Sequence, residues 1–287
     1  MLWSILSFIT ALSESTKDTI SKFGLRNINE YVLAWALRIV SSIILIFPLF
    51  FVTIPTIDTV FIYSVIIDAL FLTVTSVIYL KAIKISPLSV AIPMLTFTPL
   101  FLLITSPLIV GEMPGTKGIF GIFLIVLGAY LLNLTEKSKG LLSPFKALVK
   151  EKGPVLMLVV AIIWSITANI DKIAVEHSNP FFYAFVNNAV VSLFLTPIVF
   201  IKAKKDVNNF PKNLKYIIPI GFLGALTYVT QYLAIMLTIV PYVISIKRLS
   251  AIFSAIYGFI LFKEGHVKER LLGVIIMIIG VLFITLF

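Results

Sequence analysis

The chain lacks cysteine and has few histidines and few charged residues. Without cysteine it can form no disulfide, no zinc–thiolate site and no cysteine nucleophile. The histidines are His177 and His266, both beside predicted helix ends, so we expect no metal site built from several histidines. HExxH and GxSxG motifs and a glycine-rich nucleotide-binding loop are also missing. We therefore expect no enzyme, no resident cofactor and no direct use of ATP.

Apolar residues dominate what is present. Charged residues make up 13% of the 287 residues, against about 25% in soluble domains. Hydrophobic residues make up 60%, and the mean hydropathy is +1.10. A soluble fold would have too little polar surface to cover itself. The net charge is +10, but most Lys and Arg lie in short connections between apolar runs, where such residues set membrane topology. We expect a lipid bilayer as partner, and no nucleic acid.

The apolar runs have the length of membrane-spanning helices, about 20 residues each. The first run lacks a charged leading region and a small-residue cleavage site, so we expect it to be retained as a helix. The fold class is therefore an all-α integral membrane protein with ten transmembrane helices. The predicted helices are Leu2–Phe23, Tyr31–Val52, Thr59–Leu80, Pro87–Val110, Gly118–Leu134, Pro154–Val175, Phe181–Ile201, Tyr216–Leu237, Pro241–Phe262 and Val267–Phe287.

The two halves of the sequence resemble each other. A shift of 150 residues pairs Ala11 with Ala161, Ser15 with Ser165, Ile20 with Ile170, Lys22 with Lys172, Asn29 with Asn179, Ala34 with Ala184 and Ser42 with Ser192. A shift of 152 pairs Glu112 with Glu264, Gly121 with Gly273 and Gly128 with Gly280. Five helices is an odd number, so the second repeat enters the membrane inverted, as in many secondary transporters. We expect repeats over residues 1–135 and 154–287, joined by a polar loop over 136–153.

Loop charge predicts the orientation of the bundle. One predicted face carries only Lys117 and both chain termini. The opposite face collects Lys22, Arg26, Lys81, Lys84, the lysines of 137–152 and 202–215, Lys263, Lys268 and Arg270. This bias favours termini outside the cytoplasm of a cell-membrane protein.

Several motifs resemble the EamA-type branch of the drug/metabolite transporter superfamily over nearly the whole chain. They are the segment from Trp164 to Lys172, Arg38, the segment from Tyr79 to Pro87, Gly111-Glu112, Lys263-Glu264, and the glycines Gly121, Gly128, Gly273 and Gly280. The first repeat departs from the pattern with Glu14-Ser15 in place of a tryptophan pair. The resemblance implies a carrier in which helices 1–4 and 6–9 line a cavity while 5 and 10 pack outside. Many relatives have cytoplasmic termini, which opposes the charge bias.

The predicted helix 9 carries a basic pair, Lys247-Arg248, roughly 10 Å into the membrane at 1.5 Å per residue. Buried charges usually face protein or water and mark a transport pathway. The functional interpretation is recognition of an anion. The structural alternative is an internal ion pair with Asp68 or Asp171.

Other polar residues within the helices divide into candidates for substrate binding and for coupling. Arg38 either lines the cavity or extends to the membrane interface. Glu14, Asp18 and Lys22 form either a self-neutralising helix end or a coupling site. The remaining candidates for substrate binding are Asn187, Asn188, Tyr79, Tyr228, Gln231, Trp164 and Asn169, although the aromatic ones suit core packing equally. The candidates for proton or ion coupling are Asp68, Glu14, Asp18 and Lys172.

The function that these observations predict is secondary transport, with export of a small metabolite such as an amino acid. The two repeats would alternate in exposing a shared site. A flippase for a lipid-linked anion would instead need a lateral opening between helices. A membrane-embedded enzyme or a passive channel are alternatives of another class. We expect a monomer or a homodimer.

Overall fold

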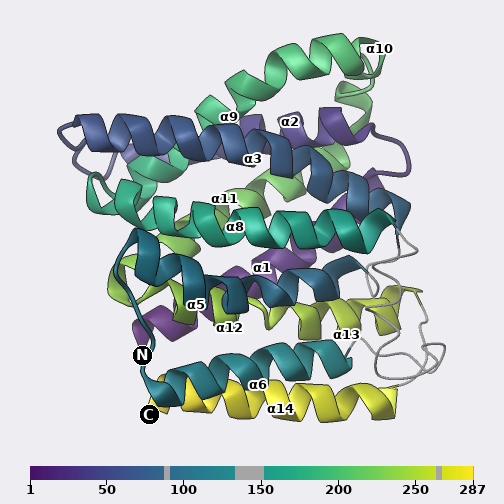
Figure 1. The fold of residues 1–287 in the computed structure, drawn as a ribbon. Coiled ribbons are helices and arrows are strands. Elements are labelled where there is room, and N and C mark those ends of the chain that lie inside the picture. Colours follow the sequence, from purple (N-terminus) through teal and green to yellow (C-terminus); the bar gives the residue numbers. More distant parts are fainter. Residues whose placement is uncertain (87–90, 133–151, 263–266, 287) are drawn as a thin grey trace.

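The computed structural model describes residues 1–86, 91–132, 152–262 and 267–286, and all regular elements in these ranges are helical (Figure 1). The first half contains α1 (Leu2–Gly24), α2 (Glu30–Leu49), α3 (Thr59–Ile85), η1 (Ile92–Phe97), α5 (Thr98–Ile109) and α6 (Thr116–Leu132). The second half contains α8 (Lys152–Glu176), α9 (Pro180–Lys202), α10 (Lys204–Val207), η2 (Pro211–Asn213), α11 (Leu214–Leu237), α12 (Val240–Lys247), α13 (Ser250–Phe262) and α14 (Val267–Leu286). Residues 136–151 of the predicted polar loop and Glu264 lie outside the described residues, whereas residues 152 and 153 belong to α8.

Six helical segments in the described ranges are long and apolar enough to cross a membrane: 30–49, 59–85, 152–176, 180–202, 211–237 and 240–257. Shorter apolar helices cover 94–109, 116–131 and 272–286. α1 has sufficient length but carries charged residues, and most of these are buried in the bundle. Large apolar side chains such as Phe47, Leu193 and Ile201 are exposed instead. Apolar side chains on the exterior, together with charged side chains buried inside, confirm the all-α membrane fold.

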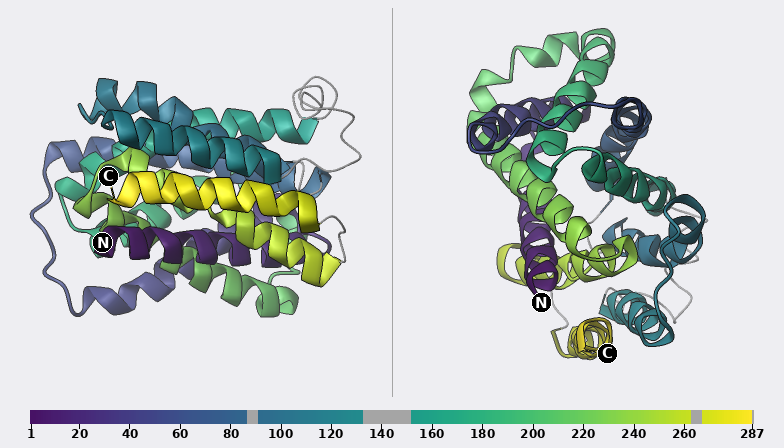
Figure 2. Two further views of the ribbon diagram at one scale, coloured as in Figure 1. Left: turned by 90° about the horizontal axis from the view of Figure 1, so that it is seen from below. Right: turned by 90° about the vertical axis from the view of Figure 1, so that its left-hand side faces the viewer.

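The two halves pack as inverted counterparts (Figures 1 and 2). α2 packs on its counterpart α9, and α6 on its counterpart α14. α1 packs on α11, and their counterparts α8 and α3 pack on each other in the same way. Both termini lie at one end of the bundle, which we call the terminal end (Figure 1). The end where α1 stops and α2 begins is called the basic end.

Four glycines join α6 and α14 at one edge of the bundle (Figure 2). A Cβ atom built on Gly121 would lie 2.7 Å from the carbonyl oxygen of Gly280. A Cβ atom on Gly128 would lie 2.6 Å from the carbonyl oxygen of Gly273. The pairing is antiparallel, and the lack of side chains on these glycines lets the two backbones lie close together.

Equivalent asparagines begin equivalent helices. The Asn29 side chain accepts a hydrogen bond from the backbone N–H of Tyr31 at the start of α2, at 3.0 Å. Its repeat counterpart Asn179 accepts from the backbone N–H of Phe182 at the start of α9, at 2.9 Å. Such caps satisfy N–H groups that have no partner within the helix.

The fourth helix of each half is interrupted at the same register. In the first half the chain forms the 3₁₀ segment η1 before α5, and a proline lies at the start of each of these two elements. In the second half α12 ends at Lys247 and α13 begins at Ser250. Between them the Arg248 N–H donates to the carbonyl of Ser245, three residues earlier in the chain. The prediction of one continuous helix from Pro241 to Phe262 was therefore wrong. No proline marks this break, so the local sequence carries no signal for it.

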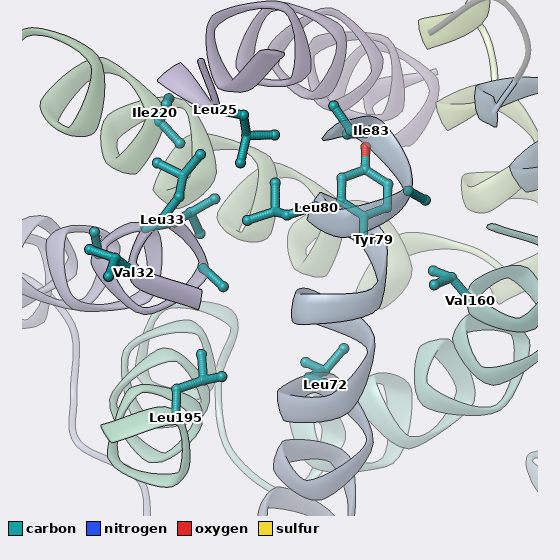
Figure 3. Packing of buried hydrophobic residues seen from close by; sticks show 14 of the residues in the cluster. Leu25, Val32, Leu33, Leu72, Tyr79, Leu80, Ile83, Val160, Leu195 and Ile220 are labelled. Atoms are coloured by element: carbon teal, nitrogen blue, oxygen red, sulfur yellow. The ribbon is translucent and has the colours of Figure 1, made fainter. Parts of the chain in front are cut away.

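An apolar cluster joins both halves toward the basic end (Figure 3). It includes Leu33 on α2, Ile83 on α3, Val160 on α8 and Ile220 on α11. Tyr79 lies in the same cluster (Figure 3). Its ring is therefore held by packing next to the polar residues described below.

Candidate functional site

A cavity lies between the halves, with about 810 Å³ of empty space that is partly continuous with solvent. Its walls come from α1, α2 and α3 of the first half and from α8, α11 and α12 of the second. The charged, amide and aromatic residues that line it are Glu14, Lys17, Arg38, Tyr79, Trp164, Asp171, Tyr228, Gln231, Tyr232, Lys247 and Arg248.

The expectation that helices 1–4 and 6–9 all line one cavity was wrong in part. η1 of the fourth helix faces a smaller adjoining pocket of about 240 Å³, whose walls include Asp18 and Arg248. α9 contributes no residue to the main cavity and instead supports its walls. Asn188 on α9, for example, accepts a hydrogen bond from Arg38.

Lys247 is engaged by protein groups. Its Nζ atom donates to Gln231 Oε1 at 2.7 Å and lies 3.6 Å from Glu14 Oε2. Glu14 also pairs with Lys17 at 3.1 Å. The structural alternative of an ion pair with Asp68 or Asp171 was therefore wrong in its partner, which is Glu14 on α1.

Arg248 has free hydrogen-bonding capacity. It sits at the break between α12 and α13 and is buried. Its Nε atom has no hydrogen-bond partner within the described part of the chain. The hydroxyls of Tyr79 and Ser21, which line the same cavity, also lack one there. Since unpaired buried donors are costly, these three groups are suited to a ligand with acceptor oxygens.

Arg38 points inward. It is only 5% exposed, so the interpretation that it extends to the membrane interface was wrong. Its guanidinium donates to Asn188 Oδ1 at 3.2 Å and to Ser76 Oγ at 3.1 Å. It also lies 4.8 Å from the ring centre of Tyr228. Arg38 and Asn188 are repeat counterparts, so this bond joins the two halves directly.

Behind the cavity lies a carboxylate network centred on Tyr183. Its hydroxyl lies 2.7 Å from Asp171 Oδ1 and 3.1 Å from Asp68 Oδ2. Asn187 donates to Asp68 Oδ2 at 2.6 Å. Gln231 donates to the second oxygen of Asp171 at 3.3 Å. Asp171 faces the cavity, whereas Asp68 is fully buried.

Asn169 and Lys172 are not among the residues that line the main cavity. Asn169 accepts a hydrogen bond from Ser106 Oγ at 2.7 Å and donates to the Ser165 carbonyl, so it fastens α8 to α5. Lys172 lies near the terminal end, 3.2 Å from Glu112 Oε1. The other Glu112 oxygen accepts the Val240 N–H at 2.7 Å, which caps α12.

Lys22 and Lys172 occupy equivalent places at opposite ends of the bundle. Lys172 donates to the carbonyls of Ile235 and Thr238 at the end of α11. Lys22 donates to the carbonyls of Ile83 and Ser86 at the end of α3. The Lys22 side chain thus donates its hydrogen bonds to backbone carbonyls. The charge of Glu14, which we expected to be neutralised within α1, is paired with Lys17 instead.

One ionisable pair lies outside the membrane-spanning segments. Asp58 Oδ2 and His177 Nδ1 are 2.6 Å apart. Asp58 also caps α3 by accepting the Phe61 N–H at 2.8 Å. This backbone bond, and next the bond with His177, lower the pKa of Asp58.

Sequence reasoning missed Ser21 and Tyr183, and it placed Lys17 beside Glu14 without counting it among the candidate site residues. Lys17 follows Glu14 by three residues, a spacing that brings side chains together on a helix. Tyr183 precedes Asn187 by four residues and so shares its face. These spacings were available signals, but nothing local indicated that their faces meet the acids of α3 and α8.

The fold and the cavity define a class: multi-pass membrane proteins with a polar chamber between inverted repeats. The model of the EamA-like transporter family matches residues 1–134 and 151–286. The chain therefore belongs to this family of membrane transporters, which confirms the resemblance seen in the sequence.

A search of solved structures supports the fold. One crystal structure superimposes with a TM-score of 0.77 at 14% identity, covering 99% of this chain and 96% of that chain. At this identity the likeness concerns the fold alone. No curated protein sequence matches this chain.

Proposed function

We propose that this protein is a secondary transporter that exports a small metabolite with an anionic group, such as an amino acid, across the cell membrane. Ten segments would cross the bilayer as two inverted five-helix repeats, over residues 1–135 and 154–287. The observation that carries the proposal is the buried Arg248 guanidinium beside a cavity between the halves, whose Nε has no hydrogen-bond partner among the described residues.

The chemistry of the cavity favours a carboxylate at Arg248. Guanidinium matches the planar geometry of a carboxylate. The hydroxyls of Ser21 and Tyr79 can donate to the same ligand, because they have no partner among the described residues. Lys247 is a weaker candidate for direct contact than the sequence suggested, since Glu14 and Gln231 already engage it.

The remainder of the cavity suits an amino acid. Asp171 faces the same space and can attract an ammonium group. Trp164 and Tyr228 supply aromatic walls for an apolar side chain. The opposite charges of Arg248 and Asp171 in one cavity would orient a zwitterion between them.

Alternating access requires contacts between the halves that can break. At the terminal end, Lys172 of the second half pairs with Glu112 of the first. Asp58 meets His177 there, and Asn179 donates to the Thr53 carbonyl at 3.0 Å. Opening at this end would separate these groups.

Uptake of radiolabelled acidic, neutral and aromatic amino acids into proteoliposomes tests the proposal. Arg248→Gln should lower uptake of the transported amino acid about 10- to 100-fold, the effect of losing a hydrogen bond to a charged group. Lys247→Ala should lower it less, through disorder of Glu14. Arg26→Gln is the matched control, because Arg26 is exposed and lies outside the cavity.

Unchanged uptake by correctly folded Arg248→Gln protein would reject the anion site. If the wild type moves a fluorescent anionic lipid but none of the amino acids, the flippase alternative is favoured. Because the chain has no cysteine, single introduced cysteines can also report which end of each predicted segment is accessible.

A further inference from the structure

The network behind the cavity contains too few hydrogens to form all of its hydrogen bonds if both Asp68 and Asp171 are ionised. The Tyr183 oxygen contacts Asp171 Oδ1 at 2.7 Å, Asp68 Oδ2 at 3.1 Å and Asn187 Nδ2 at 3.1 Å. A phenol has one hydrogen to donate. If that hydrogen goes to Asp171, at the shorter distance, the contact with Asp68 brings two oxygens together without a hydrogen between them.

Asp68 also has no cation within ion-pair distance in the described part of the chain. Within the described ranges, neither Asp68 nor Asp171 forms an ion pair within 4 Å. Arg38 is engaged by Asn188 and Ser76, and Lys247 by Glu14 and Gln231.

The burial of Asp68 makes this lack of a cation costly. The side chain is fully buried, and its Oδ1 atom has no hydrogen-bond partner in the described structure. A buried carboxylate without a paired cation is neutralised by binding a proton.

We propose that Asp68, Tyr183 and Asp171 together hold one proton in addition to the hydroxyl hydrogen of Tyr183. This proton is shared across the Tyr183 hydroxyl and is the ion coupled to transport. With one proton the cluster carries a single negative charge, and each contact of the Tyr183 oxygen with a carboxylate can contain a hydrogen. The coupling role rests on the proposed function. The proton site itself does not.

The geometry also provides a route for the proton. Asp171 faces the cavity, whereas Asp68 does not. The Tyr183 hydroxyl therefore connects a carboxylate that lines the cavity to one that is fully buried. The charged and titratable groups around the cluster are Arg38 on α2, Tyr232 on α11, Lys247 on α12, and Glu14 and Lys17 on α1, which lines the same cavity. A substrate ammonium arriving beside Asp171 would favour its ionised form and displace the proton, which links binding to proton release.

Infrared spectroscopy of the whole protein in lipid nanodiscs, without substrate, tests the site. At neutral pH the wild type should show the C=O stretching band of a buried protonated carboxylic acid. Asp68→Asn should abolish this band, Asp171→Asn should abolish or shift it, and Tyr183→Phe should shift it. Asp58→Asn is the control, because it removes a solvent-exposed carboxylate that caps α3 from outside the bundle.

Absence of the band from the wild type would overturn the proposal, as would an unchanged band in both Asp68→Asn and Asp171→Asn. A carboxylate band that shifts on addition of sodium, in the absence of an acid band, would overturn it in favour of a metal cation. Circular dichroism of each variant verifies that the helices are intact.

Transport then tests the coupling role. In proteoliposomes, a gradient of one pH unit should change the accumulation ratio of the transported amino acid up to about tenfold for one coupled proton. For Asp68→Asn this ratio should be insensitive to the gradient. A gradient response retained by Asp68→Asn would overturn coupling. Wild-type protein that transports no tested amino acid contradicts the proposed function, while the infrared band still decides the proton site.

Discussion

Replacement of Lys172 by methionine should strongly destabilise the protein at its terminal end. Met keeps the apolar stem but removes the pair with Glu112 at 3.2 Å and the bonds to two carbonyls of α11. Breaking a buried pair costs about 3–5 kcal/mol, because one charge is left unpaired. The two side chains are 11% and 15% exposed, so solvent relieves part of this cost. We therefore expect a value near the lower limit, about 3 kcal/mol.

Thermal unfolding in detergent, followed by tryptophan fluorescence, measures this loss. One kcal/mol corresponds to about 2–4 °C in domains of 150–250 residues, so Lys172→Met should lower the Tm by roughly 6–12 °C. A double-mutant cycle with Glu112→Gln then isolates the pair. Because each single change already breaks it, the double variant should be about 1–3 kcal/mol more stable than additivity predicts.

Lys22→Met provides the matched comparison. It removes the equivalent bonds to the carbonyls of Ile83 and Ser86, at the opposite end of the molecule from Glu112. Its effect should add to that of Glu112→Gln within about 0.5 kcal/mol. Additivity between Lys172→Met and Glu112→Gln as well would refute the reasoning, since it would show that their proximity contributes no energy.

Two further predictions concern the edge and the exterior of the bundle. Gly128→Leu should separate α6 from α14 and lower the Tm, because even a Cβ atom would lie 2.6 Å from the Gly273 carbonyl oxygen. Gly115→Leu is the control and should leave the Tm unchanged, because a Cβ atom there has nothing within 4 Å. Equal Tm values for the two variants would contradict the packing. The lowered pKa of Asp58 means that its charge stabilises the fold above the ordinary value of 3.8 and that this stabilisation is lost as the pH falls through the lowered value. The Tm difference between wild type and Asp58→Asn should therefore be present at pH 7 and vanish in acid, and a difference that grows in acid would exclude this cause.

Local patterns predicted most of the fold. Runs of apolar residues predict helices because unpaired backbone groups are not tolerated in lipid. The 150-residue offset between Asn29 and Asn179 predicted equivalent helix starts, and both asparagines cap helices in the same way. The 152-residue offset pairs Gly121 with Gly273 and Gly128 with Gly280, and these glycines lie where α6 and α14 come into close contact.

The candidate site was predicted only in outline. Arg38, Lys247 and Arg248 do line one cavity. Their partners, however, come from other helices at separations that no periodicity encodes: Glu14 reaches Lys247, and Asn188 reaches Arg38. Roles in binding and coupling remain predictions for all candidates.

Whether a feature can be predicted from the sequence thus depends on how far apart along the chain the residues that form it lie. Spans, caps, repeats and glycine contacts follow from neighbouring residues or from a constant offset, and each can be seen in the sequence. The break at Arg248, the pairing of Glu14 with Lys247, and the sharing of Tyr183 by two acids depend on how α1, α3, α8, α9 and α12 meet. In a low-dielectric interior a charge must find its partner nearby in space, and which partner is near is a property of the packed bundle.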